Sequence, residues 1–341
     1  MQVIDARNVN DAWDQARNLL NQTHVARPSR YGDVWEFPQP VTTLYRNPLE
    51  RVLFNPLRNA NPFFHLFESL YLLSGREDVA WLAQFNPRMK EFSDDGVRFH
   101  ASYGHRLRFA FDLDGGAEDD YADQLLKVVR MLKKSPDERR AVLGIWNPIW
   151  DLERPEIKDI PCNDLIFLKI REGKLTMTVC CRSNDVVWGC YGSNIAQFST
   201  LLEYLAAMIG VPVGAYYQVS DSWHAYTNKW SDAGGFDTTP TQDYYSEDPK
   251  CVPYPLVSCP ETFDEEVKRW VETGGKGEYA NHFFVFVANP LLQSWKAYKA
   301  GDLEEAKHLA KGMCFAKDWS RAAVEFLERI EEKRKIKNAV L

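Results

Sequence analysis

Residues 164–183, DLIFLKIREGKLTMTVCCRS, hold the pattern that decides the fold. Two apolar runs, 164–170 and 174–183, are separated by Glu172-Gly173, a dipeptide typical of a tight turn between two antiparallel strands. Another strand-like run, 141–146, precedes this hairpin, and a further one, 213–219, follows it. The middle of the chain is therefore expected to form a sheet.

Helical patterns surround these strands on both sides. The expected helices are a buried one that Gly75 ends, a strongly apolar one, two amphipathic ones and two charged ones near the C-terminus. They cover residues 62–74, 195–210, 8–22, 119–134, 291–312 and 318–336. Residues 25–56 are expected to form strands and loops. This order is not the regular strand–helix alternation of a doubly wound sheet, so the predicted class is α+β.

The same pattern predicts two parts of the chain. Residues 1–230 carry the strands and the central helices, and we expect them to form the core. A polar stretch with Gly and Pro begins at residue 231, and two charged helical segments follow it. We therefore predict that residues 231–341 are a helical extension packed on the core.

Composition limits the functions that are possible. The chain has 341 residues, of which 45% are hydrophobic and 13% aromatic, and this excludes a disordered protein. The net charge of −7 argues against nucleic acid as a main ligand. No run of 18 apolar residues predicts a membrane span, and the first residues lack an apolar signal core, so we expect a cytoplasmic protein.

The cysteines favour single thiols over a disulfide framework. None of the seven forms a Cys-x-x-Cys pair, so we expect neither a typical zinc site nor any other metal. Most of them are expected to fill the core, and one is a candidate nucleophile. They are residues 162, 180, 181, 190, 251, 259 and 314.

Two short segments carry candidate chemistry. Cys162 follows Pro161 directly before a strand, which suits a nucleophile, although a lone cysteine is more often core filler. Arg182 and Ser183 stand side by side at a strand end, where a guanidinium and a hydroxyl can share a phosphate. A surface pair between Arg182 and Asp185 explains that segment equally well.

Three further features are ambiguous when each is taken alone. Arg139-Arg140 can converge on an anion, although a solvated pair is the more common case. His224 and Tyr226 share a strand face and suit a sugar hydroxyl, although a structural histidine is more common. Glu68 lies in an otherwise apolar helix, where a carboxylate needs a reason.

The joint order of these segments resembles the thymidylate synthase family, including its pyrimidine-nucleotide hydroxymethylases. The resemblance implies an α+β fold with a central mixed sheet, packed helices and, here, a helical C-terminal extension. The matching stretches run in family order between residues 28 and 228. They are FESLYLLSG (67–75), SYG (102–104), ERRAVLGIWNP (138–148), DIPCNDLIFL (159–168), KLTMTVCCRSND (174–185), NIAQFSTLL (194–202) and DSWHAYTN (221–228).

The resemblance implies a reaction and its catalytic residues. In this family a cysteine thiolate, here Cys162, adds to C6 of a pyrimidine nucleotide. C5 then attacks the methylene carbon of the co-substrate, 5,10-methylenetetrahydrofolate. Glu68 matches the general acid/base, and Tyr103 matches the tyrosine that helps remove the C5 proton. Asn163 stands where the family usually has His after the nucleophile, and Asp185 matches the residue near the folate pterin.

The resemblance also implies how the nucleotide is held. The phosphate ligands would be Arg30, Arg182 and Ser183, together with Arg139 and Arg140 from the neighbouring subunit of a homodimer. The sugar hydroxyl would contact His224 and Tyr226. Asn194 matches the amide that reads uracil, whereas cytosine-using relatives carry Asp there. The spacing from Asp185 to Asn194 is one residue longer than in typical synthases.

Departures from the family indicate which product is made. Residues 89–92 stand where synthases place the tryptophans that shield the hydride-transfer step, and 105–108 replace a usual Gln-Trp pair. The chain also continues 115 residues past Tyr226, and its last residues only faintly echo the synthase tail. We therefore expect a dUMP hydroxymethylase that adds water in place of hydride, with modified DNA as the natural destination of the product. The alternatives are a thymidylate synthase, a dCMP or CMP hydroxymethylase, and an inactive nucleotide-binding paralogue.

Overall fold

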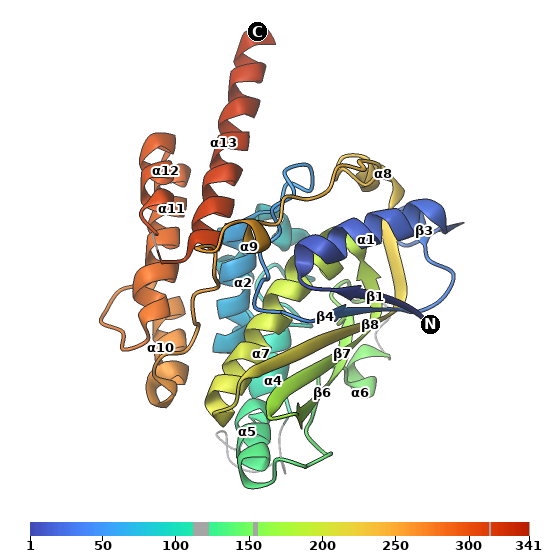
Figure 1. Cartoon of the computed structure of the whole chain (residues 1–341), viewed down its shortest axis with the longest axis vertical. Helices are drawn as coiled ribbons and strands as arrows, with labels where there is room; N and C mark the ends of the chain where they lie inside the picture. The colour runs from blue at the N-terminus through green and yellow to red at the C-terminus, as the bar shows by residue number, and fades with distance from the viewer. Residues whose placement is uncertain (112–122, 153–155, 314, 341) are drawn as a thin grey trace.

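The computed structural model describes residues 1–111, 123–152, 156–313 and 315–340, and it centres on one mixed sheet (Figure 1). The main path of the sheet runs in the order β1-β4-β8-β7-β6-β5, and β3 joins β8 and β2 at its edge. The strands are β1 (Gln2–Ala6), β2 (Val25–Arg27), β3 (Val34–Glu36), β4 (Val41–Tyr45), β5 (Val142–Gly144), β6 (Asn163–Arg171), β7 (Lys174–Asp185) and β8 (Val213–Tyr226).

The pairing directions confirm the predicted α+β class. The pairs β1–β4 and β7–β8 are parallel, and the other pairs are antiparallel. Glu172 and Gly173 close the β6–β7 hairpin with φ of 52° and 71°, the left-handed backbone that a primed two-residue turn requires. Strand β8 continues seven residues beyond the predicted 213–219, from 220 to 226, so His224 and Tyr226 lie within the sheet.

The main predicted helices are present. They are α1 (Val9–Gln22), α2 (Pro62–Ser74) and α7 (Ile195–Ile209), while α5 (Gln124–Lys134) begins later than predicted and 119–122 lie outside the described residues. Asn61 caps α2, and Gly75 ends it in the left-handed conformation at φ 76°. The short helices are α3 (Val79–Ala83), η1 (Pro87–Glu91), α4 (Tyr103–Arg108), α6 (Pro148–Asp151), η2 (Val186–Asn194), α8 (Thr227–Trp230) and α9 (Tyr244–Glu247).

The C-terminal part differs from its prediction in two places. Helix α10 (Pro260–Thr273) and the π-helical η3 (Phe284–Ala288) were not expected. The predicted helix 291–312 is divided by Gly301 into α11 (Asn289–Ala300) and α12 (Leu303–Lys311), because Gly301 adopts φ 94°. The last helix is α13 (Lys317–Val340), and its final turns project from the body (Figure 1).

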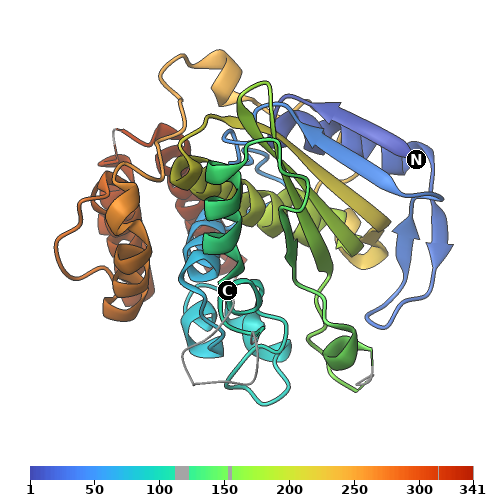
Figure 2. The same ribbon diagram turned by 90° about the horizontal axis from the view of Figure 1, so that it is seen from below.

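Several long helices pack one behind another on one side of the sheet (Figure 2). Helix α7 packs on β7 and β8, α2 packs on α7, and α10, α11 and α13 pack on α2. The rings of Phe67 in α2 and Trp270 in α10 stack at 5.6 Å. Arg108 is buried and donates to Asp264 of α10 and to Asp123. The division into a core, residues 1–230, and a helical extension, residues 231–341, stays a prediction.

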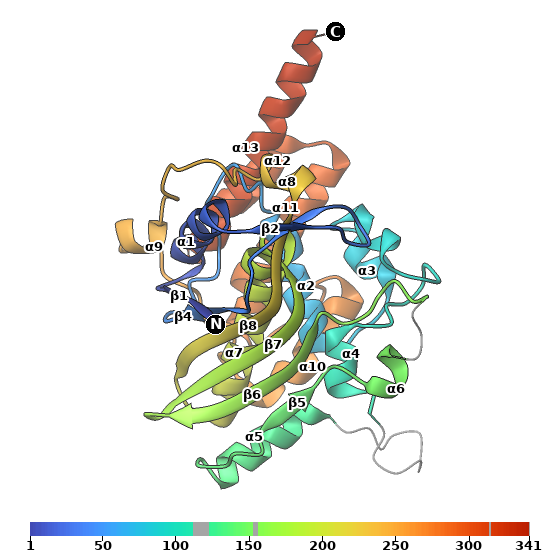
Figure 3. The same ribbon diagram turned by 90° about the vertical axis from the view of Figure 1, so that its right-hand side faces the viewer.

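The opposite face of the sheet lies open in the chain (Figure 3). Alternation along β5 and β6 buries Leu143 and Ile166 under the helices and turns their neighbours outward. Val142, Leu165 and Phe167 are 39%, 39% and 42% exposed, so this face carries apolar side chains in solvent. Among the described residues, no helix is long and apolar enough to cross a membrane.

Candidate functional site

The β6–β7 hairpin brings Cys162 and Arg182 together. The register pairs Asn163 with Cys181, so the backbone N–H of Arg182 donates to the carbonyl of Cys162 at 2.9 Å. The Arg182 guanidinium donates from Nε to the carbonyl of Pro161 at 2.8 Å, and its Nη2 lies 3.9 Å from Cys162 Sγ. The thiol is partly buried, and a cation lies directly beside it.

Opposing influences act on the Cys162 thiol. Burial raises its pKa, because a desolvated thiolate is unfavourable, and Asp159 and Asp164 raise it further. Arg182 and Arg30 act in the opposite direction by stabilising the anion. The net effect is a pKa above the usual value of a thiol, and the two arginines are the groups that favour the thiolate here.

The residues predicted to hold phosphate are only partly gathered. Arg30 is exposed, donates to the carbonyl of Lys158 at 3.1 Å and lies over the Tyr31 ring, while Ser183 follows Arg182 on β7. Arg140 is exposed and forms a two-bond pair with Glu138. Within the described chain no hydrogen bond or ion pair links Arg139 or Arg140 to Cys162 or Arg182, and their convergence on one phosphate stays a prediction.

Five side chains form a buried hydrogen-bonded chain beside Cys162. Asn163 Nδ2 donates to the Tyr103 hydroxyl at 3.0 Å and to Asn194 Oδ1 at 3.3 Å. Asn194 Nδ2 donates to Asn184 Oδ1 at 3.1 Å, and Asn184 Nδ2 donates to Ser220 Oγ at 2.9 Å. Asn184 and Ser220 were not among the predicted site residues. Asn184 lies inside the stretch 174–185 that resembles the family, but its partner Ser220 is on a different strand, β8.

Glu68 projects from α2 into the same buried region. It is 8% exposed, and its Oε2 accepts no hydrogen bond from the described residues. Burial raises its pKa from 4.5 to about 7, while the nearby side chains of Gln197 and Ser193 oppose the shift. A carboxyl group with this pKa can give or take a proton near neutral pH.

His224 and Tyr226 lie together at the end of β8. Their rings are 5.7 Å apart, edge to face. His224 Nδ1 lies 3.1 Å from Ser222 Oγ, which donates to Glu36 of β3 at 2.5 Å. This chain orients the imidazole. Ser222 lies two positions before His224 on β8, so strand alternation could have indicated it, whereas Glu36 reaches the site only through the β3–β8 pairing.

Asp185 lies at the junction of β7 and η2. Its carboxylate accepts hydrogen bonds from the backbone N–H groups of Val187 and Trp188, yet burial raises its pKa overall. Burial lowers the pKa of nearby Arg58 to about 10, while Asp185 opposes this shift. Segment η2, which links Asp185 to Asn194, is π-helical.

The segments that depart from the family have structural roles. Arg106 is buried and donates two hydrogen bonds to Asp151, at 2.6 and 2.8 Å. Asp151 also accepts a hydrogen bond from His100 when the His100 ring carries its proton on Nε2. Met89 and Phe92 pack against the core. Cys181, Cys190 and Cys251 are buried, as expected of core thiols, and Cys314 lies outside the described residues. No group of residues in the described chain could hold a metal.

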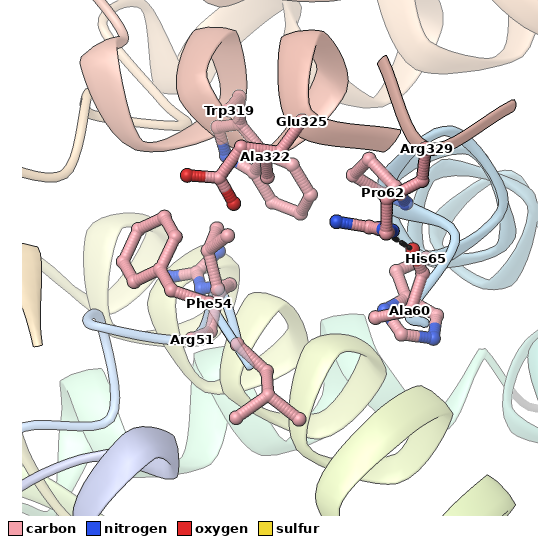
Figure 4. A pocket seen from close by; sticks show the side chains of 11 residues that line it. Arg51, Phe54, Ala60, Pro62, His65, Trp319, Ala322, Glu325 and Arg329 are labelled. Atoms are coloured by element: carbon pink, nitrogen blue, oxygen red, sulfur yellow. Dashed lines mark hydrogen bonds between the residues drawn. The ribbon is translucent and has the colours of Figure 1, made fainter. Parts of the chain in front are cut away.

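Two cavities lie under α13 and away from Cys162. The first, about 10 Å³, is lined by Arg51, Phe54, His65, Trp319 and Arg329 among others (Figure 4). Its edge is closed by Arg329, whose Nη2 donates to the carbonyl of Ala60 at 3.3 Å. A groove of about 440 Å³ continues along residues 54–57 and 237–244. These cavities show that α13 is seated on the segment that leads into α2.

Comparison with known proteins identifies the family. The thymidylate synthase family model matches residues 60–235. A deoxyuridylate hydroxymethyltransferase of Pseudomonas phage M6 is 41% identical over 346 residues, covering 96% of this chain and 94% of that protein. A protein of the same name from Bacillus phage SP01 is 44% identical over 228 residues, covering 67% of this chain and 58% of that protein.

Some more distant relatives carry the other name of the family. A protein of Methanosarcina acetivorans, provisionally named thymidylate synthase, is 30% identical over 235 residues, covering 67% of this chain and 91% of that protein. The family match includes α2, the β6–β7 hairpin and the end of β8. The predicted family is thus confirmed, while the roles of the individual site residues stay predictions. The chain belongs to the thymidylate synthase family.

Proposed function

We propose that this protein transfers a one-carbon unit to C5 of dUMP and completes it as a hydroxymethyl group. The reaction is dUMP plus methylenetetrahydrofolate plus water, giving 5-hydroxymethyl-dUMP and tetrahydrofolate. The observation that carries the proposal is the placement of Cys162 beside Arg182, next to the buried Asn163–Asn194 pair. The two phage relatives named deoxyuridylate hydroxymethyltransferase support the choice of substrate and product.

Cys162 acts as the nucleophile in this proposal. Its sulfur bonds to C6 of the pyrimidine, and the electron pair of the C5–C6 bond makes C5 nucleophilic. The same C–S bond breaks at the end and returns the thiolate. Arg182 stabilises the thiolate and, with Arg30 and Ser183, holds the phosphate, so one guanidinium serves both functions.

Glu68, Tyr103 and Asn163 move and hold protons around the base. Glu68 is buried with a pKa near 7, which suits a group that relays protons through water. The Tyr103 hydroxyl, held by Asn163 at 3.0 Å, is proposed to help remove the C5 proton. His224 and Tyr226 are proposed to hold the sugar hydroxyl, and Asn194 to read the uracil edge.

The residues present fit a folate co-substrate. Glu68 Oε2 is buried without a partner among the described residues, and Asp185 borders η2, where the Trp188 ring is 39% exposed. A pterin offers N–H groups to such carboxylates and a flat face to such a ring. Methylenetetrahydrofolate, when bound, supplies the one-carbon unit, and Asp185 is proposed to orient it.

Completion by water distinguishes this proposal from thymidylate synthesis. Lys90 and Glu91 are exposed in η1, in the region where synthases place shielding tryptophans, and Arg106 is engaged with Asp151. Segment η1 itself carries no tryptophan, so it offers no indole shield for a hydride-transfer step. The archaeal relative keeps reductive methylation as the second candidate.

The folate product tests the proposal. The protein is incubated with dUMP and methylenetetrahydrofolate, and absorbance in the dihydrofolate band is followed. No dihydrofolate should form while dUMP is consumed, and Cys162→Ser should abolish both turnover and the covalent adduct with 5-fluoro-dUMP. Dihydrofolate formed in step with dUMP consumption would favour the synthase, and a fully active Cys162→Ser would contradict the nucleophile.

We also propose a homodimer in which Arg139 and Arg140 complete the partner's site. The open sheet face with the exposed side chains of Val142, Leu165 and Phe167 supports a self-complementary contact. A mixture of Cys162→Ser and Arg140→Ala should regain about a quarter of wild-type activity after subunit exchange, because half the dimers then hold one intact site. No recovery despite proven exchange would contradict shared sites.

The phage origin of the named relatives supports two wider proposals. The protein is proposed to act in the cytoplasm of a host cell, and its product to enter modified DNA. Residues 231–341 are proposed to be an extension that braces α2 through α10 and α13.

A further inference from the structure

The Asn194 side chain retains one unused donor and one unused acceptor. Its Oδ1 has two lone pairs, one of which accepts from Asn163, and its Nδ2 has two hydrogens, one of which donates to Asn184. The remaining pair matches uracil, which offers N3–H and O4. If the amide were turned over, the same two positions would match cytosine, which offers N3 and an amino group.

An asparagine at this position is therefore not selective by itself. Selectivity requires neighbours that fix which end of the amide carries the oxygen. On one side stands Asn163, which belongs to the proposed catalytic set. On the other stands Asn184, which is 1% exposed and is engaged at both ends, with Asn194 and with Ser220.

We propose that Asn184, held in place by its hydrogen bond to Ser220, is a positioning residue that fixes the Asn194 amide and thereby sets the preference for uracil over cytosine. Asn184 Oδ1 accepts from Asn194 Nδ2 only while Asn184 Nδ2 faces Ser220 Oγ. Gly189 makes room for this contact, because a Cβ there would lie 2.9 Å from Asn184 Oδ1 and 3.3 Å from Asn194 Nδ2. The inference rests on the proposed function, since it takes Asn194 as the base reader.

Three variants test the assignment. Asn184→Ala removes the acceptor that Asn194 needs. Asn184→Asp keeps an acceptor toward Asn194 and can accept from the Ser220 hydroxyl, so it is the conservative rescue. Ser220→Ala keeps the Asn184 side chain but removes the hydroxyl that accepts its hydrogen bond. Both positions are buried in the sheet, so folding is checked by thermal unfolding before binding is measured.

The readout is the ratio of the dissociation constants of dCMP and dUMP, measured by titration calorimetry without folate. Asn184→Ala should lower this ratio by about tenfold, mainly through weaker dUMP binding, as expected for one oriented hydrogen bond. Asn184→Asp should keep the ratio within about threefold of wild type, and Ser220→Ala should fall between the two.

Several results would overturn the inference. One is an equal loss for both nucleotides in Asn184→Ala, which would make its role purely structural. Another is a fall in the ratio of the dCMP and dUMP dissociation constants in Asn184→Asp that is as large as the fall in Asn184→Ala. If Asn184→Ala fails to fold, an unchanged ratio of dissociation constants in folded Ser220→Ala would contradict the inference. A wild-type protein that binds dCMP and dUMP equally well would also contradict it.

Failure of the proposed function gives a different pattern. A wild type that prefers dUMP in binding but forms no hydroxymethylated product would refute the reaction. The variant ratios would then still decide the role of Asn184.

Discussion

The replacement of Glu68 by glutamine gives a test of its buried carboxyl group that does not depend on activity. Glu68 is 8% exposed and has a pKa near 7, against 4.5 in an exposed chain. The folded state therefore holds its proton more tightly than the unfolded state does. By linkage, this group contributes no penalty at pH 4 and destabilises the fold as pH rises through the interval from 4.5 to 7.

The size of the effect follows from the shift. A difference of roughly 2.5 pKa units corresponds to about 3 kcal/mol of unfolding free energy, all of it lost by pH 8. Glutamine has nearly the same shape and never ionises. The stability of wild type minus that of Glu68→Gln should therefore fall by about 3 kcal/mol between pH 4 and pH 8.

The assay is urea unfolding of both proteins at a series of pH values and one protein concentration. Other buried acids, such as Asp318 with a pKa near 6, affect both proteins equally and cancel in the difference. Glu266→Gln is the matched control, because hydrogen bonds from Asn281 and the backbone lower the pKa of Glu266. Its difference should change with the opposite sign. A Glu68 difference that is flat with pH, or that rises, would refute the buried neutral carboxyl.

Two further predictions follow from buried or paired arginines. Arg182→Ala should shift the pH midpoint of Cys162 alkylation by iodoacetamide upward, because Arg182 opposes the effect of burial, and an unchanged midpoint would contradict that role. Arg108→Ala should lower the unfolding free energy, measured in urea, by about 3 kcal/mol, because it leaves the carboxylates of Asp123 and Asp264 unpaired next to a buried void. A loss below about 1 kcal/mol would show that the Arg108–Asp264 ion pair does little to hold α10.

The elements that the sequence predicted well are those with local causes. Both ends of helix α2 were predicted correctly at residues 62 and 74, because nearly all its faces are apolar and Gly75 is a typical residue to end a helix. The β6–β7 hairpin follows from the Glu172-Gly173 turn. Helix α10 was missed because its buried stripe of Phe263, Val267 and Trp270 lies within a charged sequence, and it meets α2 about 200 residues away.

The residues of the candidate site likewise differ in whether a local motif or a distant contact determines their role. Cys162, Glu68 and Asn194 could be selected from motif and residue type. Asn184 could not be given a role, because its partner Ser220 is reached only through the parallel β7–β8 register. The open sheet face likewise depends on which side of the sheet the helices cover, and this is a property of the whole fold (Figure 3).

The mass of the nucleotide product tests the central claim most directly. The protein is incubated with dUMP and methylenetetrahydrofolate, and the product is measured by mass spectrometry, with one incubation in ¹⁸O-labelled water. The account predicts 5-hydroxymethyl-dUMP whose added oxygen carries the label. A product lighter by one oxygen, which is dTMP, would contradict it.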